Sequence, residues 1–299
     1  MSRGRALAGR IGRVGVWTNL LERLPAARAR DLVGAFEDLG YGAVWFPESL
    51  GSKEAFAHAA LLLRGGTRVV LATGIANIFA RDAMAMANGA RALEEAHPGR
   101  FLPGLGVSHL PSVTQRGGTY ERPVETMAAY LAAMDAAPIT LPGAIMPPRV
   151  LAALGPRMLK LAGAAADGAH PYFVPIEHTP LARRSLGPDG CLAVELACVV
   201  ATDPVVARRV ARSYTKRYLS LLNYANNLKR LGWADADLAG EGSDRLVDAL
   251  VAWGTVEQIR ARVQAHHDAG ADHVALQVLR EEWHEPPLPE LGALAKVLL

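Results

Sequence analysis

The feature that most constrains this chain is a regular alternation of short apolar runs with longer stretches of helical periodicity. The runs are nearly continuously apolar, as expected of strands that are covered on both faces. Strand candidates lie at residues 13–18, 43–47, 68–74, 101–107, 149–154, 168–174, 192–200 and 273–279. Eight strands alternating with helices predict an α/β fold, the (β/α)8 TIM barrel of roughly 250 residues plus an insertion. The same alternation also suits a doubly wound open sheet.

Helix candidates occupy the intervals between these runs, and several carry start or stop signals. Helices are expected at residues 27–39, 54–64, 82–95, 122–135, 156–166 and 255–269, with another at the C-terminus. Asp82 and Thr255 are suitable N-cap residues, Pro156 suits a first helical turn, and Gly40 and Gly270 are suitable stops.

One interval does not fit the repeat. About 70 residues separate the seventh and eighth strand candidates, far more than one strand–helix unit needs. They hold helical patterns at residues 203–231 and 243–253. We therefore expect one domain over residues 1–299, with a helical insertion at about 203–253 at the mouth of the barrel.

Composition excludes several classes of protein. The net charge is only +3 and the basic residues are scattered, so no nucleic-acid partner is expected. Cys191 and Cys198 alone cannot form a disulfide framework or a Cys-rich zinc site. No apolar run reaches about 18 residues, so no membrane-spanning helix is expected. Because no apolar run lies between Arg3, Arg5 and Arg10, we expect no signal peptide and a cytoplasmic protein.

In a barrel, functional residues lie at the carboxyl ends of the strands. Glu48 follows the run 43–47, where its carboxylate would either orient a ligand by hydrogen bonds or cap the next helix. His109 follows the fourth strand candidate and is either a structural histidine or an acid–base group, because its ordinary pKa lies near neutrality. The segment 104–109 begins like a dinucleotide fingerprint, but His109 replaces the third glycine, which argues against a Rossmann site.

Other strand ends carry glycine or ring side chains. Gly74 ends the third run, where glycine allows close approach of a flat ligand or forms an ordinary bulge. Gly155 and Pro156 join a strand to a helix whose free amides would bind a phosphate, or they form a simple tight connection. His170 and Tyr172 point to the same side of strand six and would edge a bound ring or pack in the core.

Two kinds of hydrolase are disfavoured. The chain has no GxSxG elbow and no HExxH motif, and its strand ends lack a His/Asp zinc-ligand set.

At these residues the chain resembles the bacterial-luciferase-like flavin and deazaflavin oxidoreductases, and within them the actinobacterial branch that depends on coenzyme F420. The matching stretches lie at residues 43–49, 71–82, 99–109, 152–159, 166–172, 243–248 and 269–274. The resemblance covers nearly the whole chain, and its motifs are specific jointly rather than singly.

The resemblance implies a TIM barrel, usually a homodimer, with a flat cofactor in the barrel mouth. In relatives a non-prolyl cis peptide supports the ring, and here it maps onto Gly74–Ile75. The cofactor-binding residues implied are Gly74, Ile75, Ala76, Asn77, Gly106, Ser108, Ala153, Leu154, Gly155, Pro156, His170 and Tyr172. Relatives have leucine where Pro103 stands in strand four, so we expect a local bulge there.

The resemblance also implies catalytic roles. His109 stands where some relatives carry an acidic proton donor, so the hypothesis makes His109 the general acid and Glu48 the orienting group. Pro47 and Glu48 replace the Asp-His pair of relatives that reduce sugar phosphates, which argues against such a substrate. The segment 214–231 is expected to line or cover the pocket, to pack as plain helix, or to form a dimer seam. Its pocket candidates are Tyr218, Asn223, Tyr224, Asn226 and Asn227.

The predicted function is therefore hydride transfer between coenzyme F420 and a small organic substrate. Two alternatives on the same scaffold stay open: an FMN-dependent monooxygenase and a cofactor-binding protein without turnover.

Overall fold

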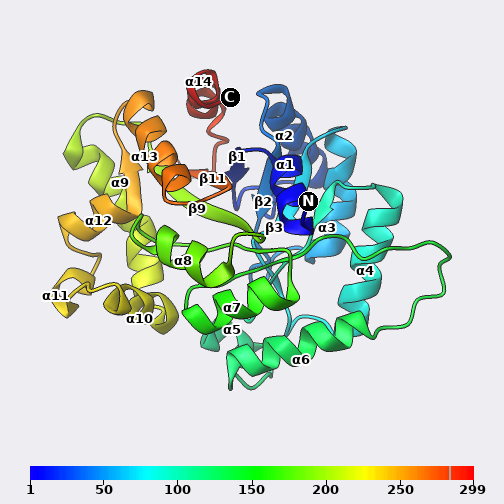
Figure 1. Cartoon of the computed structure of the whole chain (residues 1–299). Coiled ribbons are helices and arrows are strands. Elements are labelled where there is room, and N and C mark those ends of the chain that lie inside the picture. The colour runs from blue at the N-terminus through cyan, green and yellow to red at the C-terminus, as the bar shows by residue number, and fades with distance from the viewer. Residues whose placement is uncertain (283) are drawn as a thin grey trace.

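The computed structural model describes residues 1–282 and 284–299, and it places a parallel sheet inside a layer of helices (Figure 1). The strands are β1 Val14–Trp17, β2 Ala43–Phe46, β3 Val70–Thr73, β4 Ala76–Asn77, β5 Phe101–Leu102, β6 Gly104–Gly106, β7 Val150–Leu151, β8 Gly168–Ala169, β9 Cys191–Val199, β10 Val251–Trp253 and β11 His273–Val278. The helices are α1 Arg3–Ile11, α2 Ala26–Asp38, α3 Ala55–Leu62, η1 Leu63–Gly65, α4 Ala83–Ala96, α5 Leu110–Gln115, α6 Pro123–Asp135, α7 Pro156–Ala165, α8 His178–Leu186, α9 Pro204–Leu219, α10 Leu222–Arg230, α11 Asp235–Leu238, α12 Asp244–Leu250, α13 Val256–Asp268 and α14 Leu288–Leu298.

The sheet closes on itself. Strand order runs β4-β6-β7-β8-β9-β11-β1-β2-β3-β5, and each pairing along it is parallel. The third barrel strand consists of β3 and β4, and the fourth of β5 and β6. Because β3 pairs with β5 and β4 pairs with β6, the order begins and ends with the same two barrel strands. The predicted TIM barrel is confirmed, and the open doubly wound sheet is wrong.

The third and fourth barrel strands are both interrupted where they lie side by side. The third breaks at Gly74–Ile75 and the fourth at Pro103, where an irregularity was predicted. Thr73 holds the break together, because its hydroxyl donates to Gly104 O at 2.8 Å and accepts from Gly104 N at 2.9 Å. A Cβ at Gly104 would lie 2.0 Å from Thr73 O, so only glycine fits there.

Several elements were not predicted. Helix α1 precedes the first strand and packs against β8 and β9; a Cβ at Gly4 would lie 2.5 Å from Asp167 O and 2.8 Å from Cys191 N. Helices α5 and α8 lie where linker or loop was expected. The expected helix at 243–253 is wrong at its end, because Val251–Trp253 pairs in parallel with β9. The expected 203–231 helix is two helices, α9 and α10, separated at Ser220 and Leu221.

Helices α9 to α12 group at one side of the barrel (Figure 1). Asp203 caps α9 by accepting from Val205 N at 2.8 Å, and Pro204 suits the first turn. That this group is an insertion into a single domain stays a prediction. Within the described residues, no helix combines the length and apolarity needed to cross a membrane.

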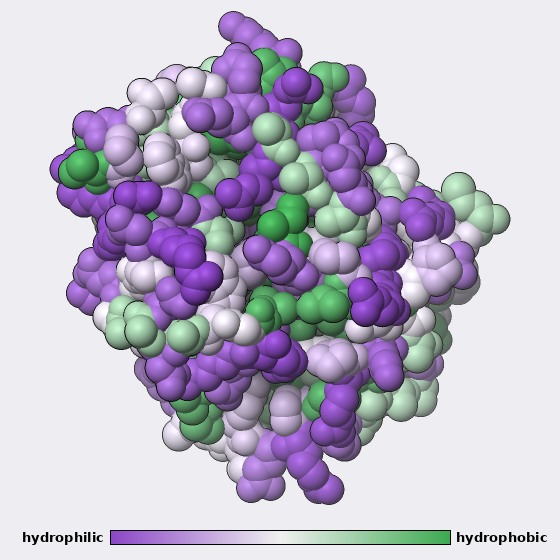
Figure 2. Space-filling model, turned by 60° about the vertical axis from the view of Figure 1, so that its left-hand side comes forward, coloured by the Kyte–Doolittle hydropathy of each residue, from purple (hydrophilic) through white to green (hydrophobic). Residues whose placement is uncertain are grey.

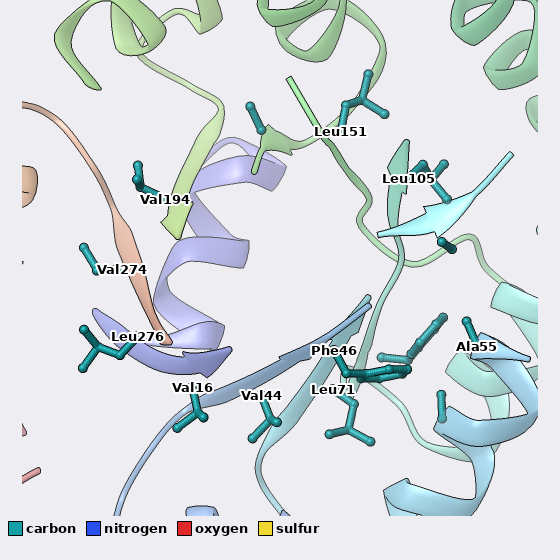
Figure 3. Close-up of a cluster of buried hydrophobic side chains, with 14 of the residues drawn as sticks. Val16, Val44, Phe46, Ala55, Leu71, Leu105, Leu151, Val194, Val274 and Leu276 are labelled. Atoms are coloured by element: carbon teal, nitrogen blue, oxygen red, sulfur yellow. The ribbon is translucent and has the colours of Figure 1, made fainter. Parts of the chain in front are cut away.

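Two apolar clusters follow the strand alternation. Val16, Val44 and Phe46 belong to the cluster that packs beneath the helices, and they lie together in Figure 3. Their neighbours Ala43 and Trp45 belong to the second cluster, which fills the barrel interior. Strands buried on both faces explain why the sequence shows nearly continuous apolar runs.

Candidate active site

A cavity of about 800 Å³ lies at the carboxyl ends of the barrel strands. Its wall is formed by strand ends from β1 to β8, the start of α7, and residues of α9 and α10. Twelve of the fourteen predicted site residues line it: Glu48, Gly74, Ile75, Asn77, Ser108, His109, Ala153, Leu154, Gly155, Pro156, His170 and Tyr172. The face shown in Figure 2 is mainly hydrophilic, with small hydrophobic patches between polar residues.

Two predicted cofactor-binding residues do not line the cavity. Ala76 is fully buried within its short strand. A Cβ at Gly106 would lie 2.5 Å from Ile75 Cγ1, so Gly106 sits behind the Ile75 side chain. In this structure Gly106 makes room for Ile75 and does not face the cavity.

The cavity floor is the cis peptide Gly74–Ile75, as the resemblance predicted. A Cβ at Gly74 would lie 2.6 Å from Trp17 Nε1 and 3.3 Å from His170 Nε2. The two side chains therefore close over this glycine, and a larger residue there would have to displace the indole.

Two buried polar atoms beside this floor have no hydrogen-bond partner in the described part of the chain: Trp17 Nε1 and His170 Nε2. His170 Nδ1 bonds Ala193 O at 2.8 Å, so Nδ1 carries the hydrogen and Nε2 is an acceptor. The imidazole stacks on Trp45 at 4.2 Å, and burial lowers the pKa of His170 to about 4. The floor thus offers one donor and one acceptor to a ligand, at the cost that unpaired buried polar groups carry.

The Glu48 carboxylate is fully engaged by protein groups. It forms an ion pair with Arg81, and its own side chain is 3% exposed. It also accepts from Asn77 N at 2.8 Å and from Ala55 N, the first residue of α3, at 3.3 Å. Glu48 therefore positions the residue that follows the cis peptide and caps a helix, so both roles considered from the sequence are present in its contacts.

His109 lies at the start of α5 with its ring against Tyr224, 5.4 Å between centroids. Its Nδ1 donates to Asn223 Oδ1 at 3.1 Å, which leaves Nε2 as an acceptor. Burial lowers the pKa of His109, while the Asn223 hydrogen bond raises it and nearby Arg217 lowers it. The ring is neutral at pH 7, which suits a base or hydrogen-bond acceptor better than the general acid expected.

The start of α7 fits an anionic group. Gly155 is its N-cap and makes no side-chain capping bond, so the first amides of the helix are free to bind a ligand. A Cβ at Gly155 would lie 3.3 Å from Arg230 Nη1, and Asn227 holds that guanidinium at 3.0 Å. Helix dipole, small residue and guanidinium converge where a cofactor phosphate was predicted.

The charged groups lining the cavity are mostly cationic. Arg116, Arg157, Arg217 and Arg230 line it, whereas Glu48 is already neutralised by its own arginine. This balance favours a ligand with several negative charges. Within the described chain no cluster of three His, Cys, Asp or Glu residues could hold a metal ion.

The segment after β9 contributes to the wall. Tyr218, Asn223 and Tyr224 line the cavity as expected, but Asn226 and Asn227 do not. The sequence interpretation missed Trp17, Arg217 and Arg230 as lining residues. Arg217 had a usable signal, because it lies three residues after Tyr214 and next to Tyr218 on one amphipathic helix.

Comparisons with known proteins agree with this architecture. The model of the family described as luciferase-like monooxygenase matches residues 11–273. The 5,10-methylenetetrahydromethanopterin reductase of Methanolobus tindarius is 24% identical over 280 residues, covering 80% of this chain and 86% of the relative.

Two solved structures share the barrel. An F420-dependent secondary alcohol dehydrogenase, solved with an F420–acetone adduct, gives a TM-score of 0.73 at 15% identity, covering 96% of this chain and 98% of the other. The oxygenating constituent of 3,6-diketocamphane monooxygenase from Pseudomonas putida, with FMN, gives 0.69 at 14% identity, covering 95% and 96%.

Proposed function

The chain belongs to the luciferase-like monooxygenase family, and from that premise we propose that it is an F420-dependent oxidoreductase acting on a small organic substrate. The reaction is transfer of a hydride between the deazaflavin and the substrate. The observation that carries this proposal is the cavity floor, where unpartnered Trp17 Nε1 and His170 Nε2 flank the Gly74–Ile75 peptide. A deazaflavin edge alternates N–H and C=O groups, which is the pattern that such a donor–acceptor pair complements.

The cationic lining supports F420 over FMN. FMN carries a single phosphate, whereas the tail of F420 carries a phosphodiester followed by carboxylates. Four arginines line the cavity and one of them, Arg230, lies beside the start of α7. That excess of positive charge matches the longer anionic tail. The relatives that use F420 include a reductase and a dehydrogenase by name.

Each lining group has a task in the reaction. The cofactor supplies the hydride chemistry when bound. The α7 amides and Arg230 bind its anionic part, and Glu48 fixes Asn77 beside the floor. His109 accepts a hydrogen bond or a proton through Nε2. Tyr218 and Tyr224 cover the cavity with aromatic surface that limits water.

A titration of the purified protein tests the proposal. Oxidised F420 and FMN are added separately, and binding is followed by the absorbance and fluorescence of each cofactor. We expect F420 to bind more tightly, and Arg230→Ala to weaken F420 about tenfold through loss of one charged contact. Lys296→Ala is the control, because this lysine lies on the C-terminal helix and does not line the cavity.

Turnover is then measured with reduced F420 and a panel of ketones, enones and imines. F420 binding with hydride consumption supports the proposal. Preferential FMN binding with oxygen consumption would replace it by the monooxygenase alternative, which the same floor geometry accommodates and a structural neighbour with FMN exemplifies. Binding of F420 without turnover on the panel would favour the carrier alternative.

A further inference from the structure

The barrel interior holds a carboxyl group that the proposed reaction has not used. Glu195 lies in the middle of β9 and is 2% exposed. Its Oε2 accepts from Phe173 N at 3.1 Å, and the Tyr214 hydroxyl lies 3.2 Å from both of its oxygens. In the described part of the chain no cation forms an ion pair with it. Burial raises the pKa of Glu195 to about 8, so the group holds a proton at neutral pH.

A row of tyrosine hydroxyls connects this carboxyl group with the cavity. Tyr214 hydrogen-bonds Tyr172 as well as Glu195. The Tyr172 hydroxyl lies 2.9 Å from the Tyr218 hydroxyl and 2.9 Å from Gln277 Oε1. Since Gln277 Oε1 can only accept, Tyr172 donates to it and accepts from a neighbouring tyrosine. Tyr218 is half-buried and lines the cavity, so the row ends where a substrate would lie.

The groups that face Glu195 keep its proton on the acid side. Tyr214 and Tyr218 face it from α9, Tyr224 from α10 and Tyr172 from the segment after β8, and Cys198 lies on the same strand. Burial raises the pKa of each of these tyrosines, so they remain neutral hydroxyls that can both give and take a proton. The nearest guanidinium on α9, Arg217, lies over the Tyr218 ring at 5.8 Å, at the cavity end of the row.

Reduction of a carbonyl needs a proton as well as a hydride, and His109 is poorly placed to give one. Its Nδ1 hydrogen is held by Asn223, and its neutral ring has an acceptor at Nε2. The proton must therefore come from another group that touches the cavity and is itself supplied from within the protein.

We propose that Glu195 stores this proton and that the hydroxyls of Tyr214, Tyr172 and Tyr218 conduct it to the cavity, with Tyr218 as the catalytic residue that meets the substrate. The proposal rests on the proposed hydride transfer. The carbonyl carbon gains the hydride and its electron pair from the reduced deazaflavin. The carbonyl oxygen forms its O–H bond with the Tyr218 proton, Tyr218 takes a proton from Tyr172, Tyr172 from Tyr214, and Tyr214 from Glu195. Glu195 is left as a carboxylate and regains a proton from solvent, so the substrate has gained two hydrogens and the deazaflavin is oxidised.

The first test needs neither cofactor nor substrate. Infrared spectra of the purified full-length chain should show a protonated carboxyl band at neutral pH that disappears as the pH rises above about 8 and is absent from Glu195→Gln. On transfer to D2O this band should shift quickly in the wild type and more slowly in Tyr214→Phe, where the row is cut. Tyr41→Phe is the matched control, because its buried hydroxyl bonds Leu291 O, away from the row. Absence of the band, or equal exchange in wild type and Tyr214→Phe, overturns the proposal.

The second test uses carbonyl reduction by reduced F420. In the wild type kcat should fall as the pH passes about 8, and Tyr214→Phe should lower kcat about a hundredfold with little change in KM. The lost step should also remove the fall above about pH 8 in Glu195→Gln. Unchanged pH profiles in both variants refute the relay while leaving hydride transfer intact. If no carbonyl is reduced at all, the proposed function fails, and the infrared exchange still decides whether the row conducts protons.

Discussion

The buried acid predicts an unusual dependence of stability on pH. The pKa of Glu195 rises from 4.5 in a solvated chain to about 8 in the fold. A raised carboxyl pKa means that the folded state keeps a proton that the unfolded state releases. The contribution is fully present below the unfolded pKa of 4.5 and is lost as the pH rises through about 8.

The size of the effect follows from the same shift. Because one pKa unit corresponds to about 1.4 kcal/mol, the free energy of unfolding should fall by about 2 kcal/mol between about pH 6.5 and about pH 8.5. This window lies above the pKa range of the buried histidines, which burial lowers from 6.5. It also lies below the range in which the buried thiols would contribute, because an unfolded cysteine ionises near 9.0.

Urea unfolding at several pH values measures the effect. Wild type should lose stability across the window, and Glu195→Gln should show a nearly flat profile, because the amide cannot ionise. Glu281→Gln is the control, since that carboxylate is 58% exposed and ends a surface ion pair. Equal slopes for wild type and Glu195→Gln would show that Glu195 is already ionised at neutral pH, and the reasoning would fail.

Three further outcomes follow from the cavity wall. Glu48→Gln should lower the free energy of unfolding by about 3 kcal/mol, because it removes the buried charge that pairs with a mostly buried guanidinium; urea unfolding measures this, and an unchanged midpoint would contradict it. Gly74→Ala should abolish cofactor binding and cost about 1–3 kcal/mol of stability, because the new methyl would lie 2.6 Å from an indole nitrogen. Asn223→Ala should lower the pKa of His109 further, since the amide stabilises the protonated ring; NMR titration checks the direction.

The barrel was predictable because each strand–helix unit carries its own local pattern. Apolar runs of four to nine residues mark strands such as β2 and β9, and capping residues such as Asp82 mark the helices that follow. The three-residue strand β10 was missed because so short a run between a helix and Gly254 has no readable period. Helix α1 was missed because its charged sequence buries only three residues.

The site was predictable where it depends on strand ends and not where it depends on long-range contacts. Strand-end logic placed Glu48, Gly74 and His109 on one cavity. Glu48 could not be recognised as fully engaged, because Arg81 lies 33 residues away in the sequence. The proton held by Glu195 arises from burial among tyrosines of other elements, which no local pattern encodes.

The Thr73 hydroxyl has a consequence for how the barrel tolerates change. It both gives and receives a hydrogen bond with Gly104 and is fully buried, so a side chain does the work of a missing ladder contact. Valine has the same shape but would leave that amide and carbonyl stranded without water. The circumference of the barrel is therefore latched by one oxygen atom next to the floor of its cavity, and this seam should give way before the rest of the wall.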